Sequence, residues 1–276
     1  MLHLNLIRLG ACRFPSRLMS TKFTSVEIND KTGVAILTLC RPPVNSANAQ
    51  MLRDIKSSID EIENNKSKGL IITSGSDKIF SAGLDVLEIY KADKAKICNI
   101  WTELQNVWLA LYGSSLPTAA AINGHAPAGG CALAIACEYR AMVPNCVIGL
   151  NETQYGLIAP RWLVSGYLNV LPQRVAERAL TQGRLYSTDE ALKEGLIDEI
   201  VNSKEEALEK CENFIKSFDQ VDPAARSLAK VQFREASIKA FEKNRQKDLD
   251  EFVSLASRPE VQKVIGDFME KNKPKK

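Results

Sequence analysis

The segment that most constrains this chain is an apolar stretch with a glycine-containing turn inside it, residues 119–137. It opens with a short apolar run, breaks at Asn123-Gly124, passes through Gly129-Gly130 and continues as a run of alanines and other apolar residues. The second run is too long and too rich in alanine to be a strand. The pattern therefore predicts a strand, a tight turn and a buried helix whose first turn contains two glycines.

The turn itself carries no side chain with obvious chemistry, which draws attention to its backbone. The first N–H groups of a helix have no partner inside the helix, and glycine lets a ligand approach them closely. The positive end of the helix dipole lies at the same place, so an oxyanion would be stabilised there. The alternative interpretation is that Gly129-Gly130 only allow close packing of the helix on the strand.

The chain before residue 160 alternates between strand and helix patterns. A hairpin at 25–29 and 34–40 precedes a helix for which Asn45 or Ser46 is the expected cap, and a short apolar strand follows at 69–74. This alternation predicts an α/β fold with helices packed on a mainly parallel sheet. Further elements are expected at 86–92 and 95–112 (helices) and at 139–143 and 147–149 (strands).

Helical periodicity dominates after residue 160. Ser187 and Glu190 have the spacing of a capping box, and Pro259 interrupts the last helical stretch. We expect one domain at 23–276, with a core at 23–200 and a helical C-terminal region at 201–276 that packs on another subunit. The helices are expected at 162–170, 175–182, 204–218 and 222–270.

Residues 1–22 have the composition of a targeting segment. They contain three arginines and a lysine, and the first acidic residue of the chain is Glu27. Leu2, Leu6 and Leu9 fall on one face at helical spacing. This pattern predicts a mitochondrial transit peptide, removed around residues 19–22, and a location in the mitochondrial matrix. A basic terminus without a targeting role is the alternative.

The overall composition argues against several classes of protein. The seven cysteines are scattered and form no CxxC pair, which favours reduced, mostly buried thiols. A formal net charge of +3 is too small to suggest nucleic acid binding. No apolar run approaches the ~20 residues of a membrane-spanning helix, no metal-ligand cluster is visible, and the C-terminus has no peroxisomal tripeptide.

A second turn resembles the first. Residues 82–85 (Ala-Gly-Leu-Asp) follow the expected strand at 69–74, as residues 128–130 (Ala-Gly-Gly) follow the strand at 119–122. Each turn offers backbone N–H groups at the end of a strand. Two such donors aimed at one point form an oxyanion hole, which can stabilise a thioester enolate.

Three segments, in order, resemble the motifs of the crotonase (enoyl-CoA hydratase/isomerase) superfamily: FSAGLD at 80–85, INGHAPAGGC at 122–131 and IGLNETQ at 148–154. The third segment, continued to Trp162, is similar to that of the mitochondrial Δ3,Δ2-enoyl-CoA isomerases. The resemblance spans about residues 24–265. It implies a ClpP/crotonase-like spiral of repeated ββα units with a helical C-terminal trimerisation region. It also implies a homotrimer, and CoA that arrives as part of the substrate without a metal or redox cofactor.

The same resemblance implies the roles of individual residues. Leu84 and Gly129 would supply the oxyanion-hole N–H groups. Family hydratases use two glutamates; Glu152 matches one of them, but Ala132 stands at the position of the other. A lone Glu152 would take a proton from C2 of a 3-cis- or 3-trans-enoyl thioester and return it to C4. The substrate-binding residues implied are Ala82, Gly83, Leu84, Asp85, Val86, Gly129 and Asn151.

Other side chains in these motifs have plain structural interpretations. Ile148, Leu150 and Trp162 are expected near Glu152, where an apolar setting would raise its pKa towards the working pH of a base. His125 is expected to be a satisfied structural histidine and Cys131 a core residue. Asp85 is expected to cap a helix rather than act as an acid.

Two other functions stay open at this point. One is a different CoA-thioester reaction, hydration or hydrolysis, although Ala132 weighs against hydration. The other is a non-catalytic binding protein of the same fold that binds RNA through a lysine-rich helix. The basic residues in question are Lys230, Lys239, Lys243, Arg245 and Lys247, interleaved with Glu235, Glu242 and Asp248. A solvated, mixed-charge face is the simpler interpretation of that helix.

Overall fold

The computed structural model describes residues 22–271, so the predicted transit peptide at 1–22 lies almost entirely outside the described residues. A six-stranded sheet forms the centre, in the order β1-β2-β3-β4-β6-β9, and a small sheet, β5-β7-β8, lies beside it. In the central sheet only the β1–β2 pair is antiparallel. The strands are β1 Thr24–Ile28, β2 Val34–Leu39, β3 Gly69–Ser74, β4 Thr118–Ile122, β5 Ala126–Pro127, β6 Tyr139–Met142, β7 Val147–Gly149, β8 Tyr186–Ser187 and β9 Glu199–Ile200.

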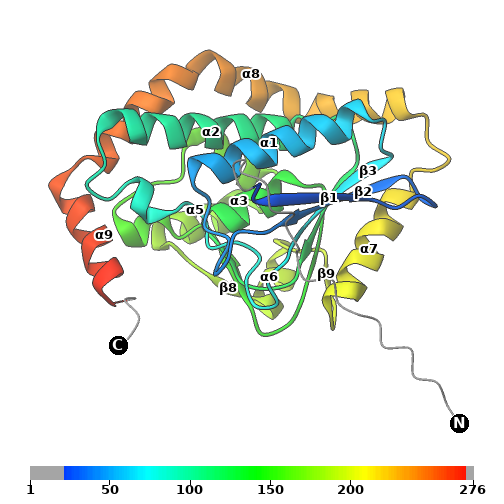
Figure 1. The fold of residues 1–276 in the computed structure, drawn as a ribbon, viewed down its shortest axis with the longest axis horizontal. Helices are drawn as coiled ribbons and strands as arrows, with labels where there is room; N and C mark the ends of the chain where they lie inside the picture. The colour runs from blue at the N-terminus through cyan, green and yellow to red at the C-terminus, as the bar shows by residue number, and fades with distance from the viewer. Residues whose placement is uncertain (1–21, 272–276) are drawn as a thin grey trace, which may run out of the picture.

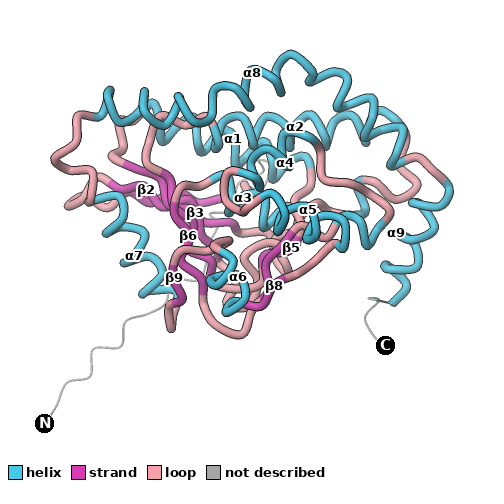
Figure 2. Tube along the Cα trace, turned by 180° about the vertical axis from the view of Figure 1, so that it is seen from behind, coloured by secondary structure: helices cyan, strands magenta, loops and turns pink. Residues whose placement is uncertain are grey.

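Helices cover both faces of this sheet (Figure 1). On one side α1 and α2 lie next to each other and the long α8 crosses over α2, while α7 packs against β3, β4 and β6 on the other side. Figure 2 shows the same layers from behind, with α3 and α5 near the small sheet and α4 next to α3. The helices are α1 Ala49–Asn64, α2 Lys94–Tyr112, α3 Gly129–Ala136, α4 Arg161–Leu168, α5 Gln173–Gln182, α6 Thr188–Glu194, α7 Lys204–Lys216, α8 Pro223–Ala256 and α9 Pro259–Lys271, with 3-10 turns η1 Val86–Glu88 and η2 Glu152–Tyr155.

The predicted α/β architecture is confirmed. The hairpin, the strand at 69–74 and the strand–turn–buried helix at 119–137 all form where the sequence patterns place them. The turn of that last unit contains an additional short strand, β5, which the sequence did not indicate. The capping box of Ser187 and Glu190 is present at the start of α6.

Two local predictions were wrong. Helix α1 is capped by Asn48, whose Oδ1 accepts the Met51 N–H at 2.8 Å, and not by Asn45 or Ser46. Asn45 instead adopts a left-handed φ of 49° and donates to Ser74 Oγ at 2.7 Å. The helix expected at 86–92 is only the 3-10 turn η1, and the φ of 51° at Lys91 would in any case stop a helix from reaching residue 92.

The C-terminal region contributes to this chain's own structure. Helix α7 lies on the central sheet and α8 packs on α2 and α4, so both bury surface within the chain. The break near Pro259 is confirmed, since α8 ends at Ala256 and α9 begins at the proline. Among residues 22–271, no helix is both long enough and apolar enough to cross a membrane.

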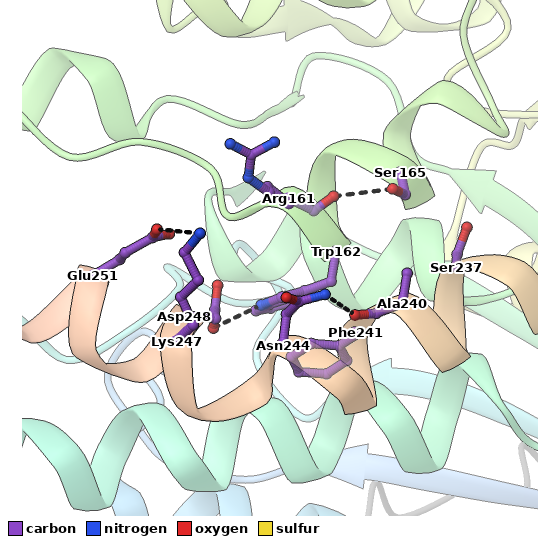
Figure 3. Close-up of a pocket in the computed structure, with 10 residues that line it drawn as sticks. All are labelled: Arg161, Trp162, Ser165, Ser237, Ala240, Phe241, Asn244, Lys247, Asp248 and Glu251. Carbon is purple, nitrogen blue, oxygen red and sulfur yellow. Dashed lines mark hydrogen bonds and ion pairs between the residues drawn. The ribbon is translucent and has the colours of Figure 1, made fainter.

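Asp248 connects α8 to α2 and α4 by hydrogen bonds. Its Oδ2 accepts hydrogen bonds from Trp101 Nε1 at 2.8 Å, Gln105 Nε2 at 2.7 Å and Trp162 Nε1 at 3.1 Å. Figure 3 shows the Trp162 contact at the floor of a groove between α4 and α8, with Phe241 beside it. One carboxylate oxygen therefore satisfies three donors from two different helices.

We expect Asp248→Ala to lower the free energy of unfolding by about 3 kcal/mol, because three partly or fully buried donors lose their acceptor together. Urea unfolding would measure the change. The matched control is Asp250→Ala on the same helix, an exposed residue that accepts one hydrogen bond within residues 22–271, from Gln246 Nε2 at 3.2 Å. Asp250→Ala is expected to lower the free energy of unfolding by less than about 0.5 kcal/mol. Equal losses in the two variants would contradict the role of Asp248.

Candidate active site

The two glycine-containing turns meet because the strands before them are parallel neighbours. Strands β3 and β4 pair in parallel, so their carboxyl ends emerge at the same edge of the sheet. Asn123 joins the turns: its Oδ1 accepts the Ser74 N–H at 3.2 Å and its Nδ2 donates to Ser76 O at 2.7 Å. Phe80 N–H donates to His125 O at 2.9 Å. Side-chain and backbone bonds thus hold the turns together.

Gly83 and Gly129 are in close contact where the turns meet. A Cβ added to Gly83 would lie 2.8 Å from Gly129 N, and one added to Gly129 would lie 3.4 Å from Leu84 N. Within residues 22–271, neither the Leu84 N–H nor the Gly129 N–H donates to any protein acceptor. Both residues are partly exposed. Two neighbouring N–H groups that lack a protein acceptor, on residues that are partly exposed, are therefore candidates for the donors of an oxyanion hole.

Ala128 adopts a strained backbone conformation at this point. Its φ of 48° and ψ of −118° lie in a region that residues with a side chain rarely occupy. A hydrogen bond from its N–H to Gly149 O, at 2.8 Å, helps to hold it there. The strained residue directly precedes Gly129 and so sets the direction of the Gly129 N–H, which is the kind of place where backbone strain accompanies function.

Strand pairing in the small sheet brings Glu152 to the same edge. Strands β5 and β7 run in parallel, with Pro127 beside Gly149. The chain continues from β5 into Gly129 and from β7 into Glu152, the first residue of η2. Both residues therefore follow the paired ends of neighbouring parallel strands, so Glu152 and Gly129 come from the same edge of the small sheet.

Glu152 is partly exposed as a residue, but one of its carboxylate oxygens is removed from solvent. Its Oε2 is buried and has no hydrogen-bond partner in the described part of the chain. Burial raises the pKa of Glu152 to about 7, against a smaller lowering by its own backbone N–H. Ile148 and Leu150, which precede Glu152 in the chain, are buried. Trp162 is also buried, and its ring packs on Trp101, Trp108 and Phe241. A carboxylate that titrates near neutral pH can both take up and release a proton under working conditions.

The remaining predicted site residues lie around these groups. Ala132 is buried in α3, so an apolar methyl occupies the position of the second hydratase glutamate. Asp85 caps η1 by accepting the Leu87 N–H at 3.1 Å and pairs with Arg41 at 2.9 Å, which agrees with the expected cap. Asn151 buries its Oδ1 without a partner among the described residues. Ala82 and Val86 are half-buried on either side of Leu84.

His125 and Cys131 occupy the structural roles expected of them. His125 Nδ1 accepts the Val147 N–H at 3.1 Å, which fixes the ring in the fold. Cys131 is fully buried, and burial raises the pKa of its thiol well above the ordinary value. In the part of the chain that the structure describes, no group of three or more His, Cys, Asp or Glu side chains could hold a metal ion.

The basic residues of α8 do not form a free cationic stripe. The Lys230 side chain is only 6% exposed; its Nζ donates to Leu116 O at 2.8 Å and pairs with Glu138 at 2.9 Å. Arg245 is held by Gln105 Oε1 at 2.9 Å. Lys239 and Lys247 are exposed and pair with Glu235 and Glu251 one turn away. The exposed face of the helix therefore carries mixed charge, as expected, which weakens the argument for RNA binding.

Sequence reasoning missed two contributors to this region. Arg41 follows β2 and holds Asp85, and Ala128 carries the backbone strain. Only Ala128 had a signal, its place between a proline and a glycine. Nothing local marks Arg41, because its partner lies far away in the sequence.

The comparisons with known proteins agree with this geometry. The model of the family described as "Enoyl-CoA hydratase/isomerase" matches residues 29–275. This chain belongs to the enoyl-CoA hydratase/isomerase family. The crystal structure of the enoyl-CoA hydratase from Bacillus halodurans shares the fold. It is 23% identical and matches with a TM-score of 0.79 over 89% of this chain and 99% of its own.

More similar members of the family carry isomerase names. "Enoyl-CoA delta isomerase 1, mitochondrial" of Rattus norvegicus is 39% identical over 95% of this chain and 91% of its own length. The Homo sapiens protein of that name is 38% identical over 97% and 87%. The crystal structure of human mitochondrial delta3-delta2-enoyl-CoA isomerase matches with a TM-score of 0.87 at 38% identity, over 90% of this chain and 97% of its own.

Proposed function

We propose that this chain is an enoyl-CoA Δ3,Δ2-isomerase, which converts 3-cis- and 3-trans-enoyl-CoA into 2-trans-enoyl-CoA. The observation that carries the proposal is one buried carboxylate, Glu152, at the same edge as two free backbone donors, with Ala132 in place of a second carboxylate. Moving one proton along an allyl system needs one base. Adding water across a double bond needs a second group to handle the water.

The mechanism follows from these groups. Glu152 takes a proton from C2, whose acidity the thioester increases, and the electron pair delocalises into the thioester as a dienolate. The N–H groups of Leu84 and Gly129 stabilise the developing oxyanion. Glu152 then returns the proton to C4, so the double bond moves into conjugation and the carboxylate is regenerated.

The biological setting comes from the relatives and from the chain's surface. The rat and human relatives are named as mitochondrial isomerases, which supports a place in β-oxidation of unsaturated fatty acids. We place the protein in the mitochondrial matrix, where residues 1–22 would direct it. Leu228 and Phe233 are 66% and 82% exposed on α8, which supports a subunit contact in a homotrimer. CoA enters as part of the substrate, and we propose no metal or redox cofactor.

The test is an assay of the purified mature chain with 3-cis-hexenoyl-CoA, with the 2-trans product separated by chromatography. We expect rapid formation of 2-trans-hexenoyl-CoA. Incubation with 2-trans-hexenoyl-CoA in parallel should give little 3-hydroxy product, because Ala132 cannot act on water. Hydration at a rate comparable to isomerisation would overturn the assignment, and so would the absence of isomerisation.

A further inference from the structure

Leu84 is held by a one-residue parallel bridge to Ala47, in the segment that follows β2. The Ala47 N–H donates to Gly83 O at 2.7 Å, and the Asp85 N–H donates to Ala47 O at 2.9 Å. A trans peptide bond is planar, so the Leu84 N–H points in the opposite direction to the Gly83 C=O. The bridge therefore turns the Leu84 N–H away from Ala47, which agrees with its lack of an acceptor in the described part of the chain.

Arg41 holds both segments of this bridge. Its Nη1 donates to Ser46 O at 2.6 Å and to Ser46 Oγ at 2.9 Å, and its Nη2 pairs with Asp85 Oδ2 at 2.9 Å. Ser46 directly precedes Ala47, and Asp85 directly follows Leu84. One planar guanidinium, whose donors have a fixed geometry, thus connects the two segments next to the bridge.

The ion pair between Arg41 and Asp85 is shielded from solvent. The two side chains are 22% and 10% exposed, so salt and water screen their attraction less than that of a surface pair. The other oxygen of Asp85, Oδ1, accepts the Leu87 N–H at 3.1 Å. Both oxygens of this carboxylate are therefore held by charge-assisted contacts, which fix the position of the residue that follows Leu84.

The direction of the Leu84 N–H matters because a hydrogen bond weakens steeply when its angle departs from linearity. An oxyanion hole is effective when its donors already point at the place where the charge develops. We propose that Arg41 is a positioning residue for the oxyanion hole: by holding Ser46 and Asp85, it fixes the peptide plane that carries the Leu84 N–H. This inference rests on the proposed isomerase function. Arg41 acts through the backbone of residues 83–85 and does not contact the reacting atoms.

The kinetic test is Arg41→Met, which keeps most of the side-chain length and removes the charged fork. We expect kcat for 3-cis-hexenoyl-CoA to fall about tenfold, less than the roughly 10²- to 10³-fold that follows from losing a donor outright. KM, and the Kd of free CoA, should change less than about twofold, because ground-state binding is retained. Arg41→Lys keeps the charge without the fork and should recover part of the loss.

The partner of Arg41 gives a second variant. Asp85→Asn should lower kcat by a similar factor. Adding it to Arg41→Met should reduce kcat little further, because the two residues act through one contact. Additive losses of kcat in the double variant would mean that the two side chains act independently, and would overturn the proposal.

An NMR signal reports on the Leu84 N–H without an activity assay. Glycine labelled with 13C at the carbonyl and leucine labelled with 15N give an HNCO spectrum with signals from Gly-Leu pairs alone. The sequence has five such pairs, whose leucines are Leu70, Leu84, Leu150, Leu157 and Leu196. Leu84→Met assigns the signal of interest by removing it. Arg41→Met should move the Leu84 signal and leave the other four in place.

The control is Arg53→Met. Arg53 is exposed on α1 and forms an ion pair with Glu103 at 3.2 Å, and its replacement should change neither kcat nor the Leu84 signal. A salt-dependent loss in Arg41→Met that is confined to KM and CoA affinity would mean that Arg41 contacts the CoA phosphates, and would overturn the proposal. So would an unmoved Leu84 signal, or equal movement of all five signals. An inactive parent would defeat the isomerase assignment instead, while the NMR comparison would still decide whether Arg41 fixes the Leu84 N–H.

Discussion

Glu152→Gln is expected to reduce isomerisation of 3-cis-hexenoyl-CoA by about 10³-fold or more, because the amide keeps the shape of the side chain but cannot take the C2 proton. The variant should remain folded and should still bind the CoA thioester, since the turns at 80–85 and 123–130 do not depend on the carboxylate. Single-turnover kinetics and binding of a saturated acyl-CoA would separate the two effects. An active variant would mean that another residue is the base.

The same substitution is expected to stabilise the protein above neutral pH. Burial raises the pKa of Glu152 from 4.5 to about 7 in the folded state. The folded protein therefore holds its proton more tightly than the unfolded chain. The stability that this bound proton contributes is fully present below the pKa of Glu152 in the unfolded chain. It is lost as the pH rises through the pKa of Glu152 in the folded protein. The neutral amide avoids this loss, so the variant should gain on the order of 1–3 kcal/mol at pH 8 and converge with the parent towards pH 4.5.

Urea unfolding of parent and variant at several pH values would measure this gain. Glu177→Gln is the control, because Glu177 is exposed on α5 and its replacement should change stability little at any pH. A Glu152→Gln variant that is less stable than the parent at pH 8 would contradict a carboxylate held in an apolar setting. Stabilisation together with loss of activity is the signature of a site whose function costs stability.

Gly83→Ala is expected to lower kcat/KM by about 10²- to 10³-fold, the scale of losing an oxyanion-hole donor. Gly83 has a φ of +85°, and a Cβ there would lie 2.8 Å from Gly129 N and 3.0 Å from the Ala128 Cβ. The methyl group would push the two turns apart and separate the Leu84 N–H from the Gly129 N–H. Because substrate contacts elsewhere would survive, the loss should appear mainly in kcat.

Gly33→Ala provides the matched control. Gly33 lies in the turn between β1 and β2 and also has a positive φ, +71°. A Cβ added there would meet only the flexible Lys68 side chain, at 3.2 Å. We expect Gly33→Ala to lose about 1 kcal/mol of stability, because of backbone strain, and to keep the activity of the parent. If both variants keep parental activity and lose stability alike, the contact of Gly83 with Gly129 does not form the oxyanion hole.

Much of the fold could be predicted from local patterns. The strand at 69–74, the hairpin and the strand–turn–helix unit at 119–137 follow from side-chain periodicity and from glycines at turns, which act over a few residues. The candidate base was also accessible from sequence, because Glu152 and Ala132 stand in motifs whose resemblance to the family is readable residue by residue. Caps and short turns were less predictable. Asn48 caps α1 instead of the expected Asn45 or Ser46, because several polar residues in one turn compete for that role.

The sequence by itself determined the order of the elements, the apolar positions of the core and the presence of one carboxylate where a hydratase would have two. Only the tertiary structure decided which distant groups meet. It placed Gly83 against Gly129 and paired Asp85 with Arg41. Periodicity reports which face of an element is buried, but not which group from another element lies opposite. That choice is made by strand order and helix packing, which depend on the whole chain at once.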